Sequence, residues 1–471
     1  MSTDNNNPHS TEVEATAEQL KQAWDDMLAM VNEARDAVDD PSLFPPPRNA
    51  RNLAEGYRYI AGFLYGSIAR SMGPTTEYPY FIRMIQPLNR STIDNSDAIY
   101  LYAPIDGNYS YTIRGRAGDT RHWRGEAPVT EGKKAPHYIF MQAASGHSGD
   151  TGELAEMKPG TRANCSTLDS NQIEVNDDGS FEILLAPEKP ADYQGNFMCT
   201  RSVKKRKNAE GEWMAREYVA ELVATRELFG DWQHEELLDL FIYRNDRLGK
   251  PMPALTPVDA ASQLRTIGKY TRNQVHFWNK FYGVTLDAYG LHTADGKQPF
   301  MPKNNFNKPN AASLATGGGM ASNIYCGGLF DLNDDEALII ELHQPVEPDY
   351  IGFCLGNLWG ESLDFANSQS SLNGLQSKRD PDNVIRHVLC HRDPGVANWL
   401  DTTGHREGYM TARWAYTTMP TEDLPWADVK KVPFDEIMQH LPDSTVTVTP
   451  EQRREAIIVR QEHVQRRYRH H

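Results

Sequence analysis

Short runs rich in β-branched and aromatic residues recur in two groups along this chain, with Asn, Asp, Gly and Pro between the runs. This pattern is typical of β-strands joined by turns. The first group lies in residues 76–250 and includes YFIRMIQP, AIYLYAPI, YSYTIRGR and HYIFMQA. The second lies in residues 315–471 and includes NIYCGGLFDL, EALIIELHQP, YIGFCLGNLW, NVIRHVLCHR and GYMTARWAYT. Together they predict a mainly β protein with helical additions, built from two β-sandwich or jelly-roll halves.

Helical patterns precede and separate these halves. Apolar residues at three-and-four spacing predict an N-terminal helical pair within residues 15–75, and the polar residues 1–14 are expected to be a disordered tail. Thr256 at a cap and Pro257 at the first helical position begin a long amphipathic pattern. We therefore expect a connecting helix and loop over residues 251–314.

The connecting helix carries apolar residues on more than one face, namely Leu264, Ile267, Tyr270, Val275, Phe277, Trp278, Phe281 and Tyr282. A helix with so wide an apolar surface needs cover on two sides. We expect it to pack between the two halves and to hold them as one unit. Near the end of the chain, Thr449 and Gln452 form a capping box that predicts a terminal helix in the second half.

Three segments of the first half allow more specific predictions. In residues 171–187, two alternating runs flank an NDDG turn and predict a hairpin. The runs at 221–228 and 237–244 are expected to pair across the turn between them, with a helix as the alternative for either run. Residues 204–217 begin with a basic run, which is typical of a solvated surface loop.

The composition excludes several classes of function. Lys and Arg number 48 against 64 Asp and Glu, and the net charge of −16 argues against general binding to nucleic acid phosphates. Five scattered cysteines without a C-x-x-C motif predict reduced thiols. The chain starts without a signal-like segment and has no run of about 18 apolar residues. We expect a cytoplasmic protein that does not enter a membrane.

Two motifs point to nucleotides, and neither has the required context. Residues 391–398 match the spacing of a protein-kinase catalytic loop, but the other kinase motifs are missing from the chain. The TGGG segment at 316–319 does not fit G-x-G-x-x-G and precedes a strand pattern instead of a helix. We therefore expect no nucleotide cofactor.

A metal site is also not expected. His387, His391 and His405, with Asp393 or Glu407, could surround an ion in a cupin-like site. However, strand residues four apart lie roughly 13 Å apart along the strand, which is too far for His387 and His391 to share one ion. The sequence thus predicts no metal ligands and no cofactor.

The richest polar stretch is 357–413, where charged residues alternate with tryptophans. Aromatic rings supply buried area and a few fixed polar groups set orientation, so the stretch predicts a small-molecule pocket. We assign catalytic roles to His391, Asp393 and Glu361, and ligand-binding roles to Arg392, Arg413, Trp359, Asn398, Trp399 and His405. The competing interpretation is a set of hydrogen-bonded turns, because Asp-Pro-Gly is turn chemistry.

Within this assignment, His391 is the proton shuttle and Asp393 or Glu361 orients or replaces it. Arg392 or Arg413 would hold an anionic or carbonyl oxygen.

The same stretch carries a resemblance to a known family. Its segments are GESLDFANSQSSLNG, IRHVLCHRDPGVANWLDTTGHREGYMTARW and the late DLPW, which include Asn398, Trp399 and Leu400 after Pro394 and Gly395. Residues 315–470 resemble the C-terminal domain of the domain-of-unknown-function twelve-fourteen family. Residues 94–115 are similar to an N-terminal β region of its longer bacterial members. The resemblance implies a jelly-roll fold and brings no assigned reaction.

Three functions follow as hypotheses. The first is a metal-independent cytoplasmic enzyme of specialised or catabolic metabolism. It would act by acid/base chemistry, as an isomerase, lyase or hydrolase, on a hydrophobic small molecule. The second is a non-catalytic ligand-binding protein with the same pocket. The third is a structural or assembly protein. The expected partner is a small molecule, with a homo-oligomer possible and no nucleic acid or membrane partner.

Overall fold

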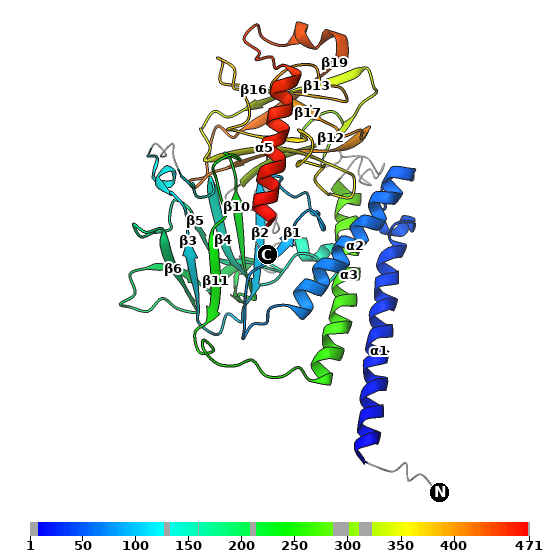
Figure 1. Cartoon of the computed structure of the whole chain (residues 1–471), viewed down its shortest axis with the longest axis vertical. Helices are drawn as coiled ribbons and strands as arrows, with labels where there is room; N and C mark the ends of the chain where they lie inside the picture. The colour runs from blue at the N-terminus through cyan, green and yellow to red at the C-terminus, as the bar shows by residue number, and fades with distance from the viewer. Residues whose placement is uncertain are drawn as a thin grey trace.

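The computed structural model describes residues 8–126, 132–158, 160–207, 213–285, 301–309 and 323–469. Two β-sandwiches lie one above the other, and the helices α1, α2 and α3 run along one side (Figure 1). The expected mainly β fold with helical additions is therefore confirmed. None of the helices within the described ranges is long and apolar enough to span a membrane.

The N-terminal sandwich has a five-stranded sheet in the order β1-β2-β10-β4-β5 and a four-stranded sheet in the order β11-β3-β6-β7. Strands β8 and β9 form a separate ribbon. The bounds are β1 (Ile82–Ile85), β2 (Ala98–Pro104), β3 (Tyr111–Arg116), β4 (Tyr138–Ala144), β5 (Asn164–Asp169), β6 (Ser180–Ala186), β7 (Asn196–Cys199), β8 (Arg201–Lys207), β9 (Trp213–Val219), β10 (Leu222–Leu228) and β11 (Asp239–Arg244).

The core of this sandwich forms between its two sheets. Ile113 of β3, Ile139 and Met141 of β4, and Val223 of β10 belong to one fully buried cluster. Because side chains alternate along a strand, every second residue of the five-stranded sheet points away from this core. That outer face is turned toward the helices and the C-terminal sandwich.

The C-terminal sandwich pairs a sheet in the order β12-β18-β14-β15 with a sheet in the order β17-β16-β13-β19. Its core lies between them and includes Ile340, Phe353 and Trp414. This unit is a β-sandwich, because its two sheets enclose one shared core. The bounds are β12 (Asn323–Asp331), β13 (Glu336–His343), β14 (Tyr350–Gly356), β15 (Ser371–Asn373), β16 (Ile385–Cys390), β17 (Trp399–Asp401), β18 (Glu407–Ala415) and β19 (Trp426–Pro433).

The helices are α1 (Pro8–Asp36), α2 (Ala50–Met72), α3 (Pro257–Thr285) and α5 (Pro450–Arg469), with short 3-10 turns η1 (Pro41–Leu43), η2 (Arg121–Arg124), η3 (Leu154–Met157) and η5 (Phe434–His440). The predicted tail is too long, because α1 begins at Pro8 and residues 8–14 are helical. Proline fits the first helical position, and no breaker follows it. Residues 1–7 lie outside the described ranges.

Helix α3 begins where the sequence predicts. Thr256 Oγ1 accepts a hydrogen bond from the Asp259 N–H at 3.2 Å, and Asp259 Oδ2 accepts one from the Thr256 N–H at 3.3 Å. The helix lies beside the sandwiches and against α1 and α2 (Figure 1). It contacts both halves from there, because Asn273 Nδ2 donates to the Asp150 carbonyl oxygen and Tyr282 packs in a cluster with Tyr409.

Two pairings predicted in the first half are wrong. Residues 171–175 contain no strand, and β6, which follows the predicted turn, pairs with β3 and β7. Strands β10 and β11 belong to different sheets. The chain crosses between the sheets where the Glu235 carboxylate accepts hydrogen bonds from the N–H groups of Gly230 and Asp231, at 2.7 and 3.0 Å.

The basic segment at 204–217 also differs from its prediction. Lys204 and Lys205 are exposed as expected, but they belong to strand β8, which pairs with β9 in an antiparallel ribbon. Ladder hydrogen bonds satisfy the backbone of a ribbon, so a charged segment can be a strand and still face solvent. The TGGG segment at 316–319 lies outside the described residues.

The two sandwiches share buried surface. Ala98, Tyr138, Phe140 and Leu228 of the five-stranded sheet cluster with Tyr350 and Ala415 of the C-terminal half. Helix α5 extends the contact, because Val464 packs with Ile99, Phe229, Trp232 and Phe365.

A limited proteolysis experiment tests this junction. Residues 248–256 are exposed and form the connection between β11 and α3, so a protease should cut there first. Because the halves share a buried cluster, we expect the two fragments to elute together on a sizing column under native conditions. Two separate, folded fragments would contradict a shared core.

Candidate ligand cavity

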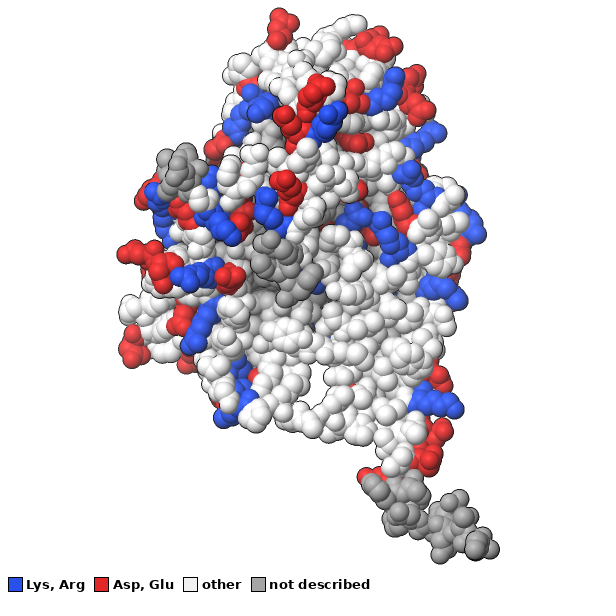
Figure 2. Space-filling model, viewed as in Figure 1, with Lys and Arg blue, Asp and Glu red and all other residues white. Residues whose placement is uncertain are grey.

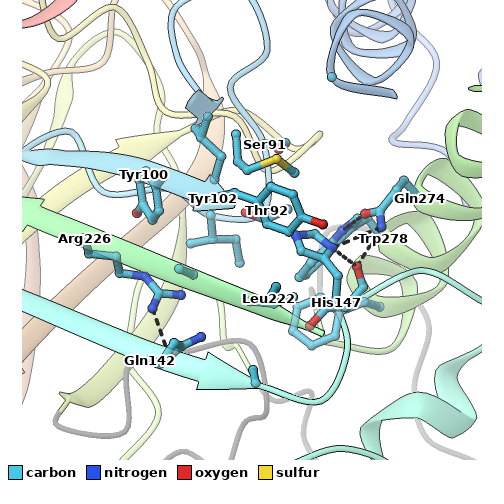
Figure 3. A pocket seen from close by; sticks show the side chains of 18 of the residues that line it. Ser91, Thr92, Tyr100, Tyr102, Gln142, His147, Leu222, Arg226, Gln274 and Trp278 are labelled. Carbon is cyan, nitrogen blue, oxygen red and sulfur yellow. Dashed lines mark hydrogen bonds between the residues drawn. The ribbon is translucent and has the colours of Figure 1, made fainter. Parts of the chain in front are cut away.

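A cavity of about 560 Å³ lies where the five-stranded sheet, the β12–β18 side of the C-terminal sandwich and the helices α2 and α3 meet. Figure 3 shows part of its lining, with the strands on one side and Gln274 and Trp278 of α3 on the other.

The outer face of the five-stranded sheet forms one wall. Arg226 of β10 lies opposite Tyr100 of β2, and Ala224 lies opposite Tyr102 and Gln142. These residues occupy alternate positions, so their side chains share the face that points away from the sandwich core. Arg226 donates to Gln142 Oε1 at 3.3 Å (Figure 3).

The C-terminal sandwich forms a second wall by the same alternation. Thr411 and Arg413 of β18 line the cavity, while Ala412 between them is buried in the sandwich core. Tyr325 and Gly327 of β12 lie opposite Arg413 and Thr411 and also line the cavity.

Helices α2 and α3 form the third wall and give it an aromatic surface. Gly62 and Gly66 of α2 lie one turn apart on this wall and let Asn89 approach the helix closely, because a Cβ added at Gly66 would lie 3.2 Å from Asn89 Nδ2. The aromatic residues around the cavity are Phe63, Tyr100, Tyr102, Tyr270, Trp278, Phe281 and Tyr325. Such a surface suits a ligand with a large apolar part.

At one end of the cavity, Arg70 is paired with a carboxylate. The Arg70 guanidinium donates two hydrogen bonds to the Asp150 carboxylate, at 2.6 and 2.9 Å, and lies 4.1 Å from the centroid of the Tyr270 ring. Beside it, Gln274 Nε2 donates to the Ser148 carbonyl oxygen at 2.7 Å. The Asp150 carboxylate therefore neutralises the charge of the Arg70 guanidinium.

His147 lies at the same end and is uncharged at neutral pH. Burial and the charge of Arg70 together lower the pKa of His147 to about 4, while Asp150 opposes the shift. Its Nδ1 lies 2.9 Å from the Ser148 carbonyl oxygen. A neutral ring in this position carries its proton on Nδ1, so Nε2 is a hydrogen-bond acceptor.

The opposite end is cationic and incompletely hydrogen-bonded. Arg413 is only 4% exposed, and its guanidinium donates to the Ile93 carbonyl oxygen at 3.2 Å and contacts Cys354 Sγ at 3.5 Å. Arg413 Nε and Thr411 Oγ1 are buried and have no hydrogen-bond partner among the described atoms.

The charged residues around the cavity are all cations in the part of the chain that the structure describes: Arg70, Arg90, Arg162, Lys204, Arg226 and Arg413. No Asp or Glu of the described ranges lines it. Lys204 is exposed, so the cavity meets solvent on that side.

Among the residues assigned from the sequence, Arg413 is the one on the described lining of this cavity. His391 Nδ1 lies 2.7 Å from Thr402 Oγ1, and its Nε2 lies 3.2 Å from the Leu332 carbonyl oxygen. Asp393 forms an ion pair with Arg453 at 2.9 Å. Such contacts are typical of hydrogen-bonded turns. They favour the competing interpretation of the 357–413 stretch over a catalytic one.

Glu361 lies elsewhere, against helix α2. Its carboxylate accepts from Arg58 at 3.1 Å and from Asn357 Nδ2 at 2.7 Å, and burial raises its pKa. Within the described contacts it shares no partner with His391. The structure therefore does not bring the predicted acid/base group together.

The remaining assigned residues connect parts of the fold. Trp359 Nε1 donates to the Asn52 carbonyl oxygen at 2.8 Å, and His405 Nε2 lies 2.7 Å from Glu55, so both tie the C-terminal half to α2. The other three residues have their contacts within the C-terminal half. The Arg392 guanidinium lies 4.0 Å from the centroid of the Phe434 ring. Asn398 Nδ2 donates to the carbonyl oxygens of Lys378 and Arg386, and Trp399 Nε1 donates to that of Cys390.

The sequence offers three histidines, His387, His391 and His405, as candidate metal ligands. His387 is 1% exposed and packs on Phe353, and burial lowers its pKa to about 3. The described residues contain no group of three or more His, Cys, Asp or Glu side chains placed to hold a metal ion.

Comparisons with known proteins show the fold but no activity. No family model and no curated protein matches the chain. The crystal structure of a putative uncharacterized protein from Burkholderia cenocepacia is 22% identical, covers 89% of this chain and 99% of its own, and has a TM-score of 0.70. A Vibrio parahaemolyticus structure is 12% identical, covers 86% of this chain and all of its own, and has a TM-score of 0.40. The resemblance to the twelve-fourteen family stays a prediction.

Proposed function

We propose that this protein binds a largely apolar small molecule in the cavity between its two sandwiches and the helices α2 and α3. The cavity itself carries the proposal: its volume of about 560 Å³ falls within the range of ligand pockets, roughly 300–1,000 Å³. Aromatic rings from both halves and from the helices surround it. Of the three hypotheses from the sequence, these observations favour ligand binding.

The acid/base enzyme hypothesis relied on His391, Asp393 and Glu361, which have their own structural partners away from the described cavity lining. The proposal therefore moves from the polar turns to the cavity. It retains Arg413 as a ligand-binding residue. A cytoplasmic location is part of the proposal, and the five free cysteine thiols support a reducing compartment.

Filling the cavity should weaken ligand binding strongly. Ala224→Phe places a phenyl ring on the cavity face of β10 without changing charge. We expect the native protein to bind the neutral probe N-phenyl-1-naphthylamine saturably, with increased fluorescence, and the variant to bind it at least about tenfold more weakly.

The matched control is Ala215→Phe, at an exposed position of β9 outside the described lining. It should bind the probe like the native protein. Unchanged binding in an Ala224→Phe variant with native circular dichroism would show that the probe binds elsewhere, and the proposed function would fail.

A further inference from the structure

We infer that the cavity recognises a ligand with an oxyanion head, a carboxylate or a phosphate, on an apolar body, and that Arg413 and Arg226 hold the head. The inference rests on the proposed function and adds the chemical class of the ligand.

The first argument is the contrast between the surface and the cavity. Figure 2 shows Asp and Glu interspersed with Lys and Arg over the visible face, as expected for a chain with a net charge of −16. The described cavity lining instead contains Arg and Lys and no carboxylate. Buried cations are costly unless an anion is near them. Arg70 has such an anion in Asp150, whereas no carboxylate accepts a hydrogen bond from Arg413 in the described structure, so a ligand can supply the negative group there.

The second argument is the set of partners around Arg413. Its hydrogen-bond acceptors are the carbonyl oxygen of Ile93 and the thiol of Cys354. Burial raises the pKa of Cys354 to about 11, so this thiol is neutral. Asp94 lies nearby, but its carboxylate accepts its hydrogen bonds from the N–H and hydroxyl of Ser362, at 2.8 and 2.7 Å. Neither acceptor neutralises the guanidinium.

The third argument is the supply of donors at this end. Arg413 Nε and Thr411 Oγ1 are buried without a partner in the described structure, and both belong to the cavity-facing side of β18. Tyr100 accepts a hydrogen bond from the Asn95 N–H at 2.7 Å, so its own hydroxyl proton can be donated. An oxyanion accepts from several donors at once, which an apolar or cationic group cannot do.

The position of the head follows from the difference between the two ends. Arg70 is paired with Asp150 at one end. At the other end, the Arg226 guanidinium lies 5.7 Å from the centroid of the Tyr100 ring. Burial raises the pKa of Tyr100, and the charge of Arg413 opposes this shift. The apolar body then extends past Tyr102 toward Trp278, as these side chains lie in Figure 3.

Calorimetric titration with four probes of equal chain length tests the inference. Decanoate and decyl phosphate carry an oxyanion, decanol is neutral and decyltrimethylammonium is a cation. We expect either oxyanion to bind at least about tenfold more tightly than decanol, and the cation more weakly than decanol. The tighter of the two oxyanions identifies the preferred head.

Variants locate the head. Arg226→Gln and Arg413→Gln should bring the ratio of decanoate to decanol affinity close to one while decanol affinity changes less than about threefold. Arg116→Gln, on an exposed part of β3 outside the described lining, should keep the native ratio. If Arg413→Gln does not fold, the affinity ratio of Arg226→Gln alone tests the inference.

The outcomes separate the two proposals. Equal binding of decanol and both oxyanions by the native protein, or a preference for the oxyanion that Arg226→Gln leaves unchanged, would overturn the inference and leave the cavity as a binding site. If none of the probes binds, the proposed function fails as well.

Discussion

Replacing Asp97 by alanine is expected to lower the free energy of unfolding by about 3–5 kcal/mol, because it removes the acceptor at the centre of a buried network. Asp97 is 1% exposed and accepts from Trp232 Nε1 at 2.9 Å, Tyr350 Oη at 2.6 Å and Asn373 Nδ2 at 3.0 Å. Two of these donors come from the C-terminal sandwich, so the change weakens the junction between the halves.

The measurement is a urea titration followed by circular dichroism. Glu182→Ala is the control, because Glu182 pairs with Arg114 on the surface and should change the free energy of unfolding by less than about 1 kcal/mol. Equal, small effects of both variants would mean that the junction contributes little to stability.

The second large effect is a pH dependence that originates at Glu227. This residue is fully buried on β10, and burial raises its pKa to about 7, while Arg83 opposes the shift and Asp239 adds to it. Its Oε2 accepts from the Leu238 N–H at 3.0 Å, and its Oε1 has no hydrogen-bond partner in the described structure. The folded state therefore binds a proton that the unfolded state releases.

The sign follows from this difference in proton binding. The stabilising contribution of Glu227 is full below the unfolded pKa, near 4.5, and is lost as the pH rises through about 7. The loss amounts to roughly 3 kcal/mol. Glu227→Gln removes the titration, so its stability relative to the native protein should rise by about this amount between pH 5 and pH 8.

Urea titrations of both proteins at the two pH values measure this change, since the other titrating groups are common to both and cancel. The exposed substitution Glu182→Gln should leave the pH profile native-like. Parallel profiles for Glu227→Gln and the native protein would show that the Glu227 carboxyl does not keep its proton in the fold.

Local signals predicted the elements well because they act within a few residues. Thr256 and Asp259 cap α3 through neighbouring backbone groups, and Thr449 and Gln452 do the same for α5. Strand pairing could not be predicted in this way. The partners of β10 are β2 and β4, more than 70 residues away, and alternation in the sequence does not identify a distant partner.

The cavity was missed for a related reason. The LVATREL pattern places Ala224 and Arg226 on one face of a strand, but the sequence does not show that helices and a second sandwich cover this face. Polar residues such as His391 and Asp393 are dense in the sequence, and this density favours the prediction of an active site there. Their density reflects turns that satisfy their own hydrogen bonds.

The most direct test of the account is a crystal structure of the protein with 12-bromododecanoate, in which anomalous scattering locates the bromine. We predict one bromine peak between Tyr102 and Trp278 and the carboxylate within hydrogen-bond distance of Arg413. An empty cavity, with the bromine on the surface at saturating ligand, would contradict the claim that this cavity is the binding site.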